Sequence, residues 1–355
     1  MQTAKRIKMT GPLIGTHNGH FHADEALAVY LLRLLPDYHG SGLLRSRDPE
    51  LLKTCHTVVD VGGVYDDAQK RYDHHQREFD TSFPSHATKL SSAGLVYMHF
   101  GKAIISYCTG LSQDHPDVDL LYTKLYDDFV EAFDANDNGI AVFDATEVRK
   151  SGLQRKFQDK GFSIASVVNR FNYSHPTPTP SVGAESTPEQ RQAQEDERFL
   201  KASHFVGEQF LSELMDKYHS WLPARATVKQ AFSERTKYDE HGRIMIVPYK
   251  PGGVPWSDHL YALEKETGAE GNVLYVLFPE NGEPDCKWRI RAVGIEAGGF
   301  ENRKSLPDAW KGVRDDELSK VSGIPGCIFV HASGFIGGNK TFDGALEMAK
   351  QALAI

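Results

Sequence analysis

The sequence predicts an α/β fold with two domains, and three observations support this prediction. Short β-branched segments alternate with helical segments in the first half of the chain, an order typical of a parallel sheet with crossover helices. With 355 residues, the chain is longer than one hydrophobic core usually accommodates. A stretch rich in Pro, Ser and Thr over residues 174–190 then precedes a second set of strands. We therefore predict a parallel-sheet domain over residues 1–190, a linker helix over 191–222 and a smaller α/β domain over 223–355.

The first domain is expected to contain three strands and three helices. The first helix is apolar on nearly all sides, which predicts that it is buried, and Pro36 ends it. The second helix has Ser91 or Ser92 as its N-cap and Gly101 as its stop. In chain order, the expected elements are a strand ending near residue 15, a helix over 23–35, strands over 57–66 and 71–76, and helices over 91–101 and 117–134.

The linker helix and the second domain follow from periodicity. Residues 191–218 place apolar side chains along one helical stripe. Four β-branched or alternating segments then predict strands, and the chain closes with an amphipathic helix. These strands are expected over residues 243–249, 272–278, 287–293 and 326–332, and the closing helix over 341–354.

Composition and charge exclude several classes of protein. Hydrophobic residues make up 40% of the chain and charged residues 25%, and no apolar run is long enough for a membrane helix. A net charge of −8 argues against a protein that coats nucleic acid generally, but it is compatible with a local positive groove. The four cysteines lie far apart without a CxxC pair, which favours a reducing compartment. The basic start "MQTAKRIKMTG" lacks the apolar region of a secretion signal and is compatible with a mitochondrial presequence.

Acids and histidines gather where the predicted strands end. Seven of the sixteen histidines lie within the first 75 residues. Loops that follow the carboxyl ends of parallel strands meet at one edge of the sheet. Four segments bring carboxylate or imidazole groups there: His17, His20, His22, Asp24 and Glu25; then Asp60; then Asp73, His74 and His75; and, after a helix, Asp134 and Asp137. The predicted metal ligands among them are His17, His22, Asp24, Asp60, His74, Asp134 and Asp137.

This pattern favours a hydrolytic site with two divalent metal ions. Two ions about 3.5–4 Å apart need a bridging carboxylate, terminal ligands and open positions for water and phosphate. Mixed imidazole and carboxylate ligands suit Mn²⁺ best, with Zn²⁺, Co²⁺ and Mg²⁺ as competitors. Adjacent side chains on a strand point to opposite faces, so we expect His74 to bind metal and His75 to contact a substrate phosphate from the rim. Asp73 would then orient an imidazole. Taken singly, each residue is also compatible with a structural role.

Further candidates lie outside this cluster. The helix start at Ser91 and Ser92 is compatible with a phosphate site or with a simple cap. In "KWRIRAV", Lys287, Arg289 and Arg291 share one strand face, which favours a positive wall, although such faces are often only solvated. The segment "HASGFIGGNK" brings glycines and a lysine that would let a backbone approach phosphate. Its candidate residues are His331, Gly334, Gly337, Gly338 and Lys340. Trp256 and Trp310 are expected to anchor the core.

Six motifs occur in a fixed order: "HNGHFHADEALA", "DVGG", "YDHHQ", "DNGI", "VPW" and "GFIGGNKTFDGAL". The "DHH" after a strand resembles the DHH phosphoesterase superfamily. The full combination, from residue 17 to residue 346, is more similar still to the eukaryotic melanocyte-proliferating-gene family of DHH proteins. This resemblance implies a metal-dependent phosphodiesterase in which a DHH-type domain carries two metal ions and a smaller domain closes over the substrate. The nearer family is linked to 3′→5′ RNA exonuclease activity in mitochondria and the nucleus.

The resemblance also implies roles for individual residues. His17, His22 and Asp24 match the first motif, Asp60 the aspartate that bridges the metals, His74 the inward ligand and His75 the phosphate contact. The superfamily often has aspartate where this chain has His22, which leaves the choice of metal open. The fourth motif supplies one aspartate, and we prefer Asp134 to Asp137 because the apolar helix runs directly into it.

We therefore expect a phosphodiesterase that releases nucleoside monophosphates from the 3′ end of single-stranded RNA or short oligonucleotides. Two other classes stay open. One is a phosphohydrolase acting on pyrophosphate, polyphosphate or a cyclic dinucleotide with the same metals. The other is a catalytically silent RNA-binding protein, against which the complete ligand set argues. The expected location is the mitochondrion or nucleus, or the cytoplasm if the basic start is not a targeting signal, and a homodimer is compatible with the sequence.

Overall fold

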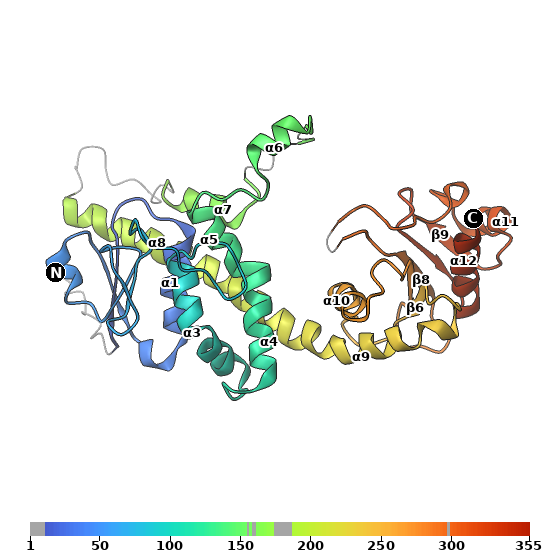
Figure 1. Ribbon diagram of the computed structural model, residues 1–355, viewed down its shortest axis with the longest axis horizontal. Helices are drawn as coiled ribbons and strands as arrows, with labels where there is room; N and C mark the ends of the chain where they lie inside the picture. Colours follow the sequence, from blue (N-terminus) through green and yellow to red (C-terminus); the bar gives the residue numbers. More distant parts are fainter. Residues whose placement is uncertain (1–10, 155, 158–160, 174–186, 297–298) are drawn as a thin grey trace, which may run out of the picture. The chain divides into compact units, whose positions relative to one another are not determined.

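The computed structural model describes residues 11–154, 156–157, 161–173, 187–296 and 299–355 (Figure 1). The chain divides into two compact units, Met1–Met215 and Asp216–Ile355. Most of the predicted Pro-, Ser- and Thr-rich loop and the basic start lie outside the described residues. Among the described helices, none has the length and apolar character needed to cross a membrane.

The first unit is built on a five-stranded sheet with the order β2-β1-β3-β5-β4. Neighbours among β2, β1, β3 and β5 are parallel, as the sequence predicts, but β4 pairs with β5 in the antiparallel sense. The sheet is therefore mixed, because residues 67–70 form a connection too short for a parallel crossover. The strands are β1 (Leu13–Thr16), β2 (Gly42–Arg45), β3 (Thr57–Val59), β4 (Tyr65–Asp66) and β5 (Arg71–Tyr72).

Two buried helices form the centre of this unit. The predicted apolar helix, α1 (Ala23–Leu34), packs against α3 (Ser92–Thr109). The predicted stop at Gly101 is wrong, because α3 continues to Gly110, whose φ of 76° ends the helix. Gly101 serves packing instead, since a Cβ there would lie 2.8 Å from Cε2 of Tyr122.

The structure contains the predicted helix over 117–134 and the predicted linker helix, together with three short helices that we did not predict (Pro49–Leu52, Ala145–Lys150 and Ile164–Phe171). A π-helical turn over Tyr126–Val130 interrupts the predicted helix over 117–134. The long helix α8 buries the stripe expected from its sequence, including Phe199, Val206 and Phe210. The helices are α2 (Pro49–Leu52), α4 (Pro116–Leu125), α5 (Glu131–Asp137), α6 (Ala145–Lys150), α7 (Ile164–Phe171) and α8 (Pro188–Asp216).

The second unit is also an α/β structure with a mixed sheet, in the order β6-β7-β8-β10-β9. Only β6 and β7 are parallel; the other pairs are antiparallel. The strand β10 falls where we expected a glycine-rich loop, because glycine is rare inside strands and concealed the pattern. The strands are β6 (Ile244–Ile246), β7 (Tyr275–Pro279), β8 (Trp288–Ala292), β9 (Cys327–Val330) and β10 (Ile336–Asn339).

Helices cover both faces of this second sheet. One core cluster joins Tyr275 and Ile290 to α12, and another joins Val276 and Val293 to α9 and α10. Trp310 is buried as predicted, whereas Trp256 is only half-buried. A second π-helical turn, over Lys217–Trp221, lies between α8 and α9, and the predicted domain limits at residues 190 and 222 stay predictions. The helices are α9 (Leu222–Ser233), α10 (Ser257–Thr267), α11 (Asp315–Ser322) and α12 (Phe342–Ala354).

Candidate metal centre

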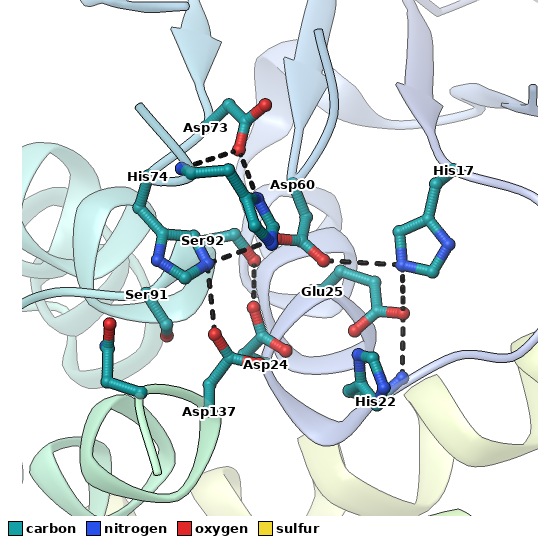
Figure 2. Close-up of polar contacts among 12 residues, drawn as sticks. His17, His22, Asp24, Glu25, Asp60, Asp73, His74, Ser91, Ser92 and Asp137 are labelled. Carbon is teal, nitrogen blue, oxygen red and sulfur yellow. Dashed lines mark hydrogen bonds and ion pairs between the residues drawn. The ribbon is translucent and has the colours of Figure 1, made fainter. Parts of the chain in front are cut away.

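The carboxyl ends of three neighbouring parallel strands meet at one edge of the first sheet. His17 follows β1, Asp60 follows β3 and Asp73 to His75 follow β5. Because β1 pairs with β3 and β3 pairs with β5, Asp60 lies between the two histidine-bearing segments. Figure 2 shows His17 and His74 approaching Asp60 from opposite sides. The strand-end rule therefore explains why these residues come together.

Asp60 faces two groups of candidate ligands with its two carboxylate oxygens. Its Oδ2 lies 3.3 Å from Nε2 of His17, and its Oδ1 lies 3.3 Å from Nε2 of His74. The residue is buried, and its φ of 58° is in the left-handed region. A non-glycine residue in that region is strained, and such strain concentrates at functional sites. This is the geometry expected of a bridging carboxylate.

The first group consists of His17, His22, Glu25 and Asp60, whose ligand atoms lie within 4.8 Å of one another. Glu25 was not in our predicted ligand set. It lies in the first turn of α1, where Oε1 accepts a hydrogen bond of 2.8 Å from the backbone N–H of His22 and lies 3.1 Å from Nε2 of His17. Glu25 and His22 form a capping box, so one carboxylate both caps α1 and lies beside His17.

The second side of Asp60 is formed by two neighbouring groups that share no residue. One contains Asp60, His74 and His75, and the other contains His22, Asp24 and Asp137. Asp137 Oδ2 lies 3.0 Å from Nε2 of His74, which connects the two groups (Figure 2). Asp24 is fully buried in the first turn of α1. The structure thus brings together all the predicted ligands except Asp134.

Asp134 lies close by but its oxygens are already engaged, which corrects our preference for it over Asp137. Its Oδ1 accepts hydrogen bonds from the N–H and Oγ of Ser91 and from the N–H of Gly94, and its Oδ2 accepts one from Tyr126. Burial raises the pKa of Asp134 to about 6, although these hydrogen bonds oppose the rise. Asp134 therefore caps the start of α3, and Asp137 is the better candidate ligand.

The same contacts favour the cap over the phosphate site, the two alternatives that the sequence left open for Ser91 and Ser92. Both serines are completely buried. Ser91 is bound to Asp134, and the hydroxyl of Ser92 donates a 2.8 Å hydrogen bond to Asp24 Oδ2 (Figure 2). A carboxylate already satisfies this helix start, so the serines support the site by fixing Asp24 and Asp134.

His75 takes the rim position predicted for it. Its side chain is 62% exposed, against 5% for His74, so the two adjacent imidazoles have different surroundings. Nδ1 of His75 lies 2.7 Å from Oδ1 of the buried Asp73, whose other oxygen accepts a 2.6 Å hydrogen bond from the N–H of Gly63. Asp73 therefore orients the exposed imidazole and leaves its Nε2 available to a substrate.

Arg45 stabilises the loop between β1 and α1, which carries His17 and His22. The guanidinium is buried and donates to the backbone carbonyls of His17, at 3.1 Å, and Gly19, at 2.7 Å. Its Nη1 lies 3.5 Å from a carboxylate oxygen of Asp196 on α8. The loop between β1 and α1 is thereby connected to the core of the unit.

The site brings several ionisable side chains together in a buried setting, and this shifts the pKa values of its histidines and aspartates. Burial opposes the charge on His17 and His74, but the neighbouring carboxylates of Asp60, Glu25 and Asp137 outweigh it and raise the pKa of His17 to about 10 and that of His74 to about 9. Burial, together with the charges of Asp60 and Glu25, raises the pKa of Asp24 well above its usual value. Burial also works against ionisation of Asp60, yet its close contacts with the two histidines lower its pKa to about 2.

The residues present fit divalent metal ions. Several buried polar atoms here make no hydrogen bond with any residue that the structure describes, which is rare for buried groups. Metal ions would satisfy these oxygens and nitrogens and offset the mutual repulsion of the carboxylates. The unsatisfied atoms are Asp24 Oδ1, Glu25 Oε2, Asp60 Oδ1 and both ring nitrogens of His74.

We predict that metal binding releases protons. A pH of 7.5 lies below the raised pKa values of His17 and His74, so both imidazoles are protonated in the metal-free protein. An imidazole must lose its proton to bind metal, so Mn²⁺ should release about two protons per chain. The affinity should rise with pH and become flat above about pH 9–10, where both histidines are already neutral. Titration calorimetry in two buffers of different ionisation enthalpy measures the protons released.

The matched control for this experiment is His20→Gln, since His20 is an exposed neighbour outside all three ligand groups. This variant should release the same number of protons as the unmodified protein. Release of no protons on Mn²⁺ binding would contradict the assignment of His17 and His74 as ligands.

The substrate-binding residues predicted in the second unit do not form the single glycine-rich loop that we expected. Gly337 and Gly338 lie inside β10, between β8 and β9, so they do not form a phosphate loop. A Cβ at Gly338 would lie 2.4 Å from Nη1 of Arg289, so glycine makes room for that guanidinium. Gly334, with a φ of 72°, makes the turn that precedes β10. His331 and Arg291 line a common cavity, whereas Lys340, after β10, does not line it.

Comparison with known proteins decides the family. A family model described as "Uncharacterised protein family (UPF0160)" matches residues 13–353, and the mouse MYG1 exonuclease is 44% identical over 352 residues, covering 98% of this chain and 86% of the mouse protein. The chain belongs to the MYG1 exonuclease family. The human MYG1 exonuclease is 43% identical, covering 98% of this chain and 87% of the human protein.

Two further similarities also extend over all or nearly all of this chain. The MYG1 protein YER156C of Saccharomyces cerevisiae is 42% identical over 358 residues and covers the whole of both chains. A solved structure of a pGpG-specific phosphodiesterase from Vibrio cholerae covers 97% of this chain and 99% of its own, at 12% identity and a TM-score of 0.27. That last likeness is too weak to support an argument. The family match therefore spans both units of this MYG1-family chain.

Proposed function

We propose that this MYG1-family protein is a metal-dependent phosphodiesterase that removes nucleotides from the 3′ end of single-stranded RNA or short oligonucleotides. The observation that carries this proposal is the position of Asp60, whose two oxygens face separate groups of candidate ligands. A shared carboxylate between two ligand groups is the arrangement that two-metal phosphodiester hydrolysis requires. The mammalian relatives named as exonucleases support nucleic acid as the substrate.

The ligand groups would hold two divalent ions, with Mn²⁺ as the expected metal. His17, His22 and Glu25 would hold one ion, Asp24, His74 and Asp137 the other, and Asp60 both. When bound, the ions supply a water of lowered pKa and neutralise charge on the phosphate. We place the arrangement within the DHH superfamily on the strength of the sequence motifs, as part of the same proposal.

The chain's own residues position the substrate phosphate. His75 is exposed, and its Nδ1 is held by Asp73, so Nε2 can donate to a non-bridging phosphate oxygen. Negative charge develops on that oxygen in the transition state, so this contact is stronger in the transition state than in the ground state. Asp73 itself is fixed by the N–H groups of Gly63 and His75, which keeps the imidazole oriented before substrate arrives.

The experiment that tests this function uses metal-stripped protein and single-stranded RNA labelled at its 5′ end, resolved on a sequencing gel. After addition of Mn²⁺ or Mg²⁺, we expect a ladder that shortens from the 3′ end. Intact RNA together with phosphate released from pyrophosphate would move the same site to small-molecule substrates. Intact substrates of both classes with every metal would contradict the proposed hydrolysis and favour a binding protein. Location in the mitochondrion or nucleus and a homodimeric state stay predictions.

A further inference from the structure

The second unit contains two adjoining cavities on one face of its sheet. They have volumes of about 490 Å³ and 570 Å³. Both are lined by Trp256, at the start of α10, and by Arg291, on β8. Because two residues belong to both walls, the cavities form one groove with two compartments, which we call the bipartite groove.

Arg291 stands at the junction of the two compartments with its charge available. Its guanidinium carbon lies 5.9 Å from the ring centroid of Trp256 and 5.9 Å from that of Phe335. No described carboxylate forms an ion pair with it, whereas the neighbouring Arg289 on the same strand face is paired with Glu280. Lys287, the third residue of the predicted positive wall, lines neither cavity, so in the groove the wall reduces to one available guanidinium between aromatic rings.

Each compartment combines aromatic surface with polar groups. The first is lined by Tyr261, His331 and Phe335, and the amide of Asn302 also faces it. The second is lined by Tyr249 and Phe278, with Lys250 beside them. Trp256 packs partly on the core and is half-buried, so the rest of its ring is left to the groove.

We propose that the bipartite groove binds two consecutive nucleotides of a single strand, with one base in each compartment and the connecting phosphate on Arg291. Bases stack on aromatic side chains whatever their sequence, and arginine binds phosphate through a planar fork of donors. A groove with aromatic surface on both sides of Arg291 matches the order base, phosphate, base. This proposal rests on the proposed function, because it names the substrate segment that the second unit holds.

The residues that line the groove predict a ligand of low net charge. A run of many phosphates would need several free cations, and only Arg291 and Lys250 are candidates among the described lining residues of this face. The groove is therefore suited to the dinucleotide unit rather than to the backbone of a duplex, whose binding depends on many phosphate contacts.

The test measures binding by full-length protein in EDTA, where no turnover occurs. The probes are adenylyl-3′,5′-adenosine, which has two bases and one connecting phosphate, and adenosine monophosphate, which has one base. We expect the dinucleotide to bind at least about tenfold more tightly, because a second stacked base contributes about that factor or more. It should also quench tryptophan emission, and Trp256→Phe should remove most of that quenching while the fold is retained.

Arg291→Met should weaken binding of the dinucleotide by about tenfold or more. The matched control is Arg225→Met, since Arg225 is an exposed arginine of the same unit, on α9, and lines neither compartment. This control should bind as the unmodified protein does. Equal affinity for the two probes, or equal affinity of the two arginine variants, would overturn the proposal.

The two proposals fail in different ways. If metal-loaded protein shortens labelled RNA but Arg291→Met leaves dinucleotide affinity unchanged, the bipartite groove is refuted and the phosphodiesterase stands. If the dinucleotide binds as expected while RNA stays intact with every metal, the groove is supported and the hydrolytic function is refuted.

Discussion

Replacing Asp60 by asparagine should abolish phosphodiester hydrolysis, with a loss of at least about 10³-fold in kcat. Both oxygens of Asp60 face candidate ligand groups, 3.3 Å from His17 on one side and 3.3 Å from His74 on the other. Asparagine keeps the size of the side chain but supplies one oxygen and an amide that cannot bind a metal ion. Activity on labelled RNA and the Mn²⁺ content of the purified protein measure the two consequences.

The matched control for Asp60→Asn is Asp80→Asn, since Asp80 is an exposed aspartate that belongs to none of the ligand groups. It should retain full activity and metal content. Circular dichroism should show the same secondary structure for both variants. Hydrolysis at the normal rate by Asp60→Asn would rule out a bridging role for this carboxylate.

The second large effect separates two aspartates that lie three residues apart on the same helix. Asp137→Asn should lose most Mn²⁺ binding and at least about 10²-fold in activity, because it removes an anionic ligand 3.0 Å from His74. Asp134→Asn should remain active. An asparagine there keeps an oxygen for Ser91 and Gly94, and its amide can donate to the hydroxyl of Tyr126, which replaces the present hydrogen bond from that hydroxyl.

Alanine at the same two positions provides the complementary result. Asp134→Ala leaves buried donors unsatisfied and should lower the free energy of unfolding by about 2–4 kcal/mol in a urea titration. Asp137 is partly exposed, and Asp137→Ala should change the stability of the metal-free protein much less. Loss of activity in Asp134→Asn with normal activity in Asp137→Asn would reverse our assignment.

The cluster itself was predictable from the sequence because its main residues follow strands. His17, Asp60 and His74 each come directly after, or within two residues of, a parallel strand, and neighbouring parallel strands bring their carboxyl ends together. The opposite orientations of the two adjacent histidines also followed from strand geometry: His74 is buried and His75 is exposed. The α/β class and most element positions were predictable from the same alternation of patterns.

The choice between Asp134 and Asp137 was not predictable, because it depends on the rotation of the helix that carries them. The π-helical turn at Tyr126–Val130 inserts an extra residue into the turn and changes which face the following residues present. Sequence periodicity cannot locate such a turn. Glu25 was missed for a related reason, since its capping hydrogen bond to His22 and its place beside His17 use the same carboxylate.

Glycines account for two further errors, because the reason for a glycine is often a neighbour that is distant in sequence. Gly101 makes room for Tyr122 and Gly338 makes room for Arg289, and neither ends its helix or strand. From the sequence alone, these positions were interpreted as a helix stop and a loop.

The measurement that tests the two-metal account most directly is a crystal structure of the protein grown with Mn²⁺, with anomalous scattering collected near the manganese edge. We predict two anomalous peaks, one on each side of the Asp60 carboxylate, with His17, His22 and Glu25 nearest the first and Asp24, His74 and Asp137 nearest the second. A single peak that Asp60 does not contact, or no peak among these residues at saturating Mn²⁺, would contradict the account.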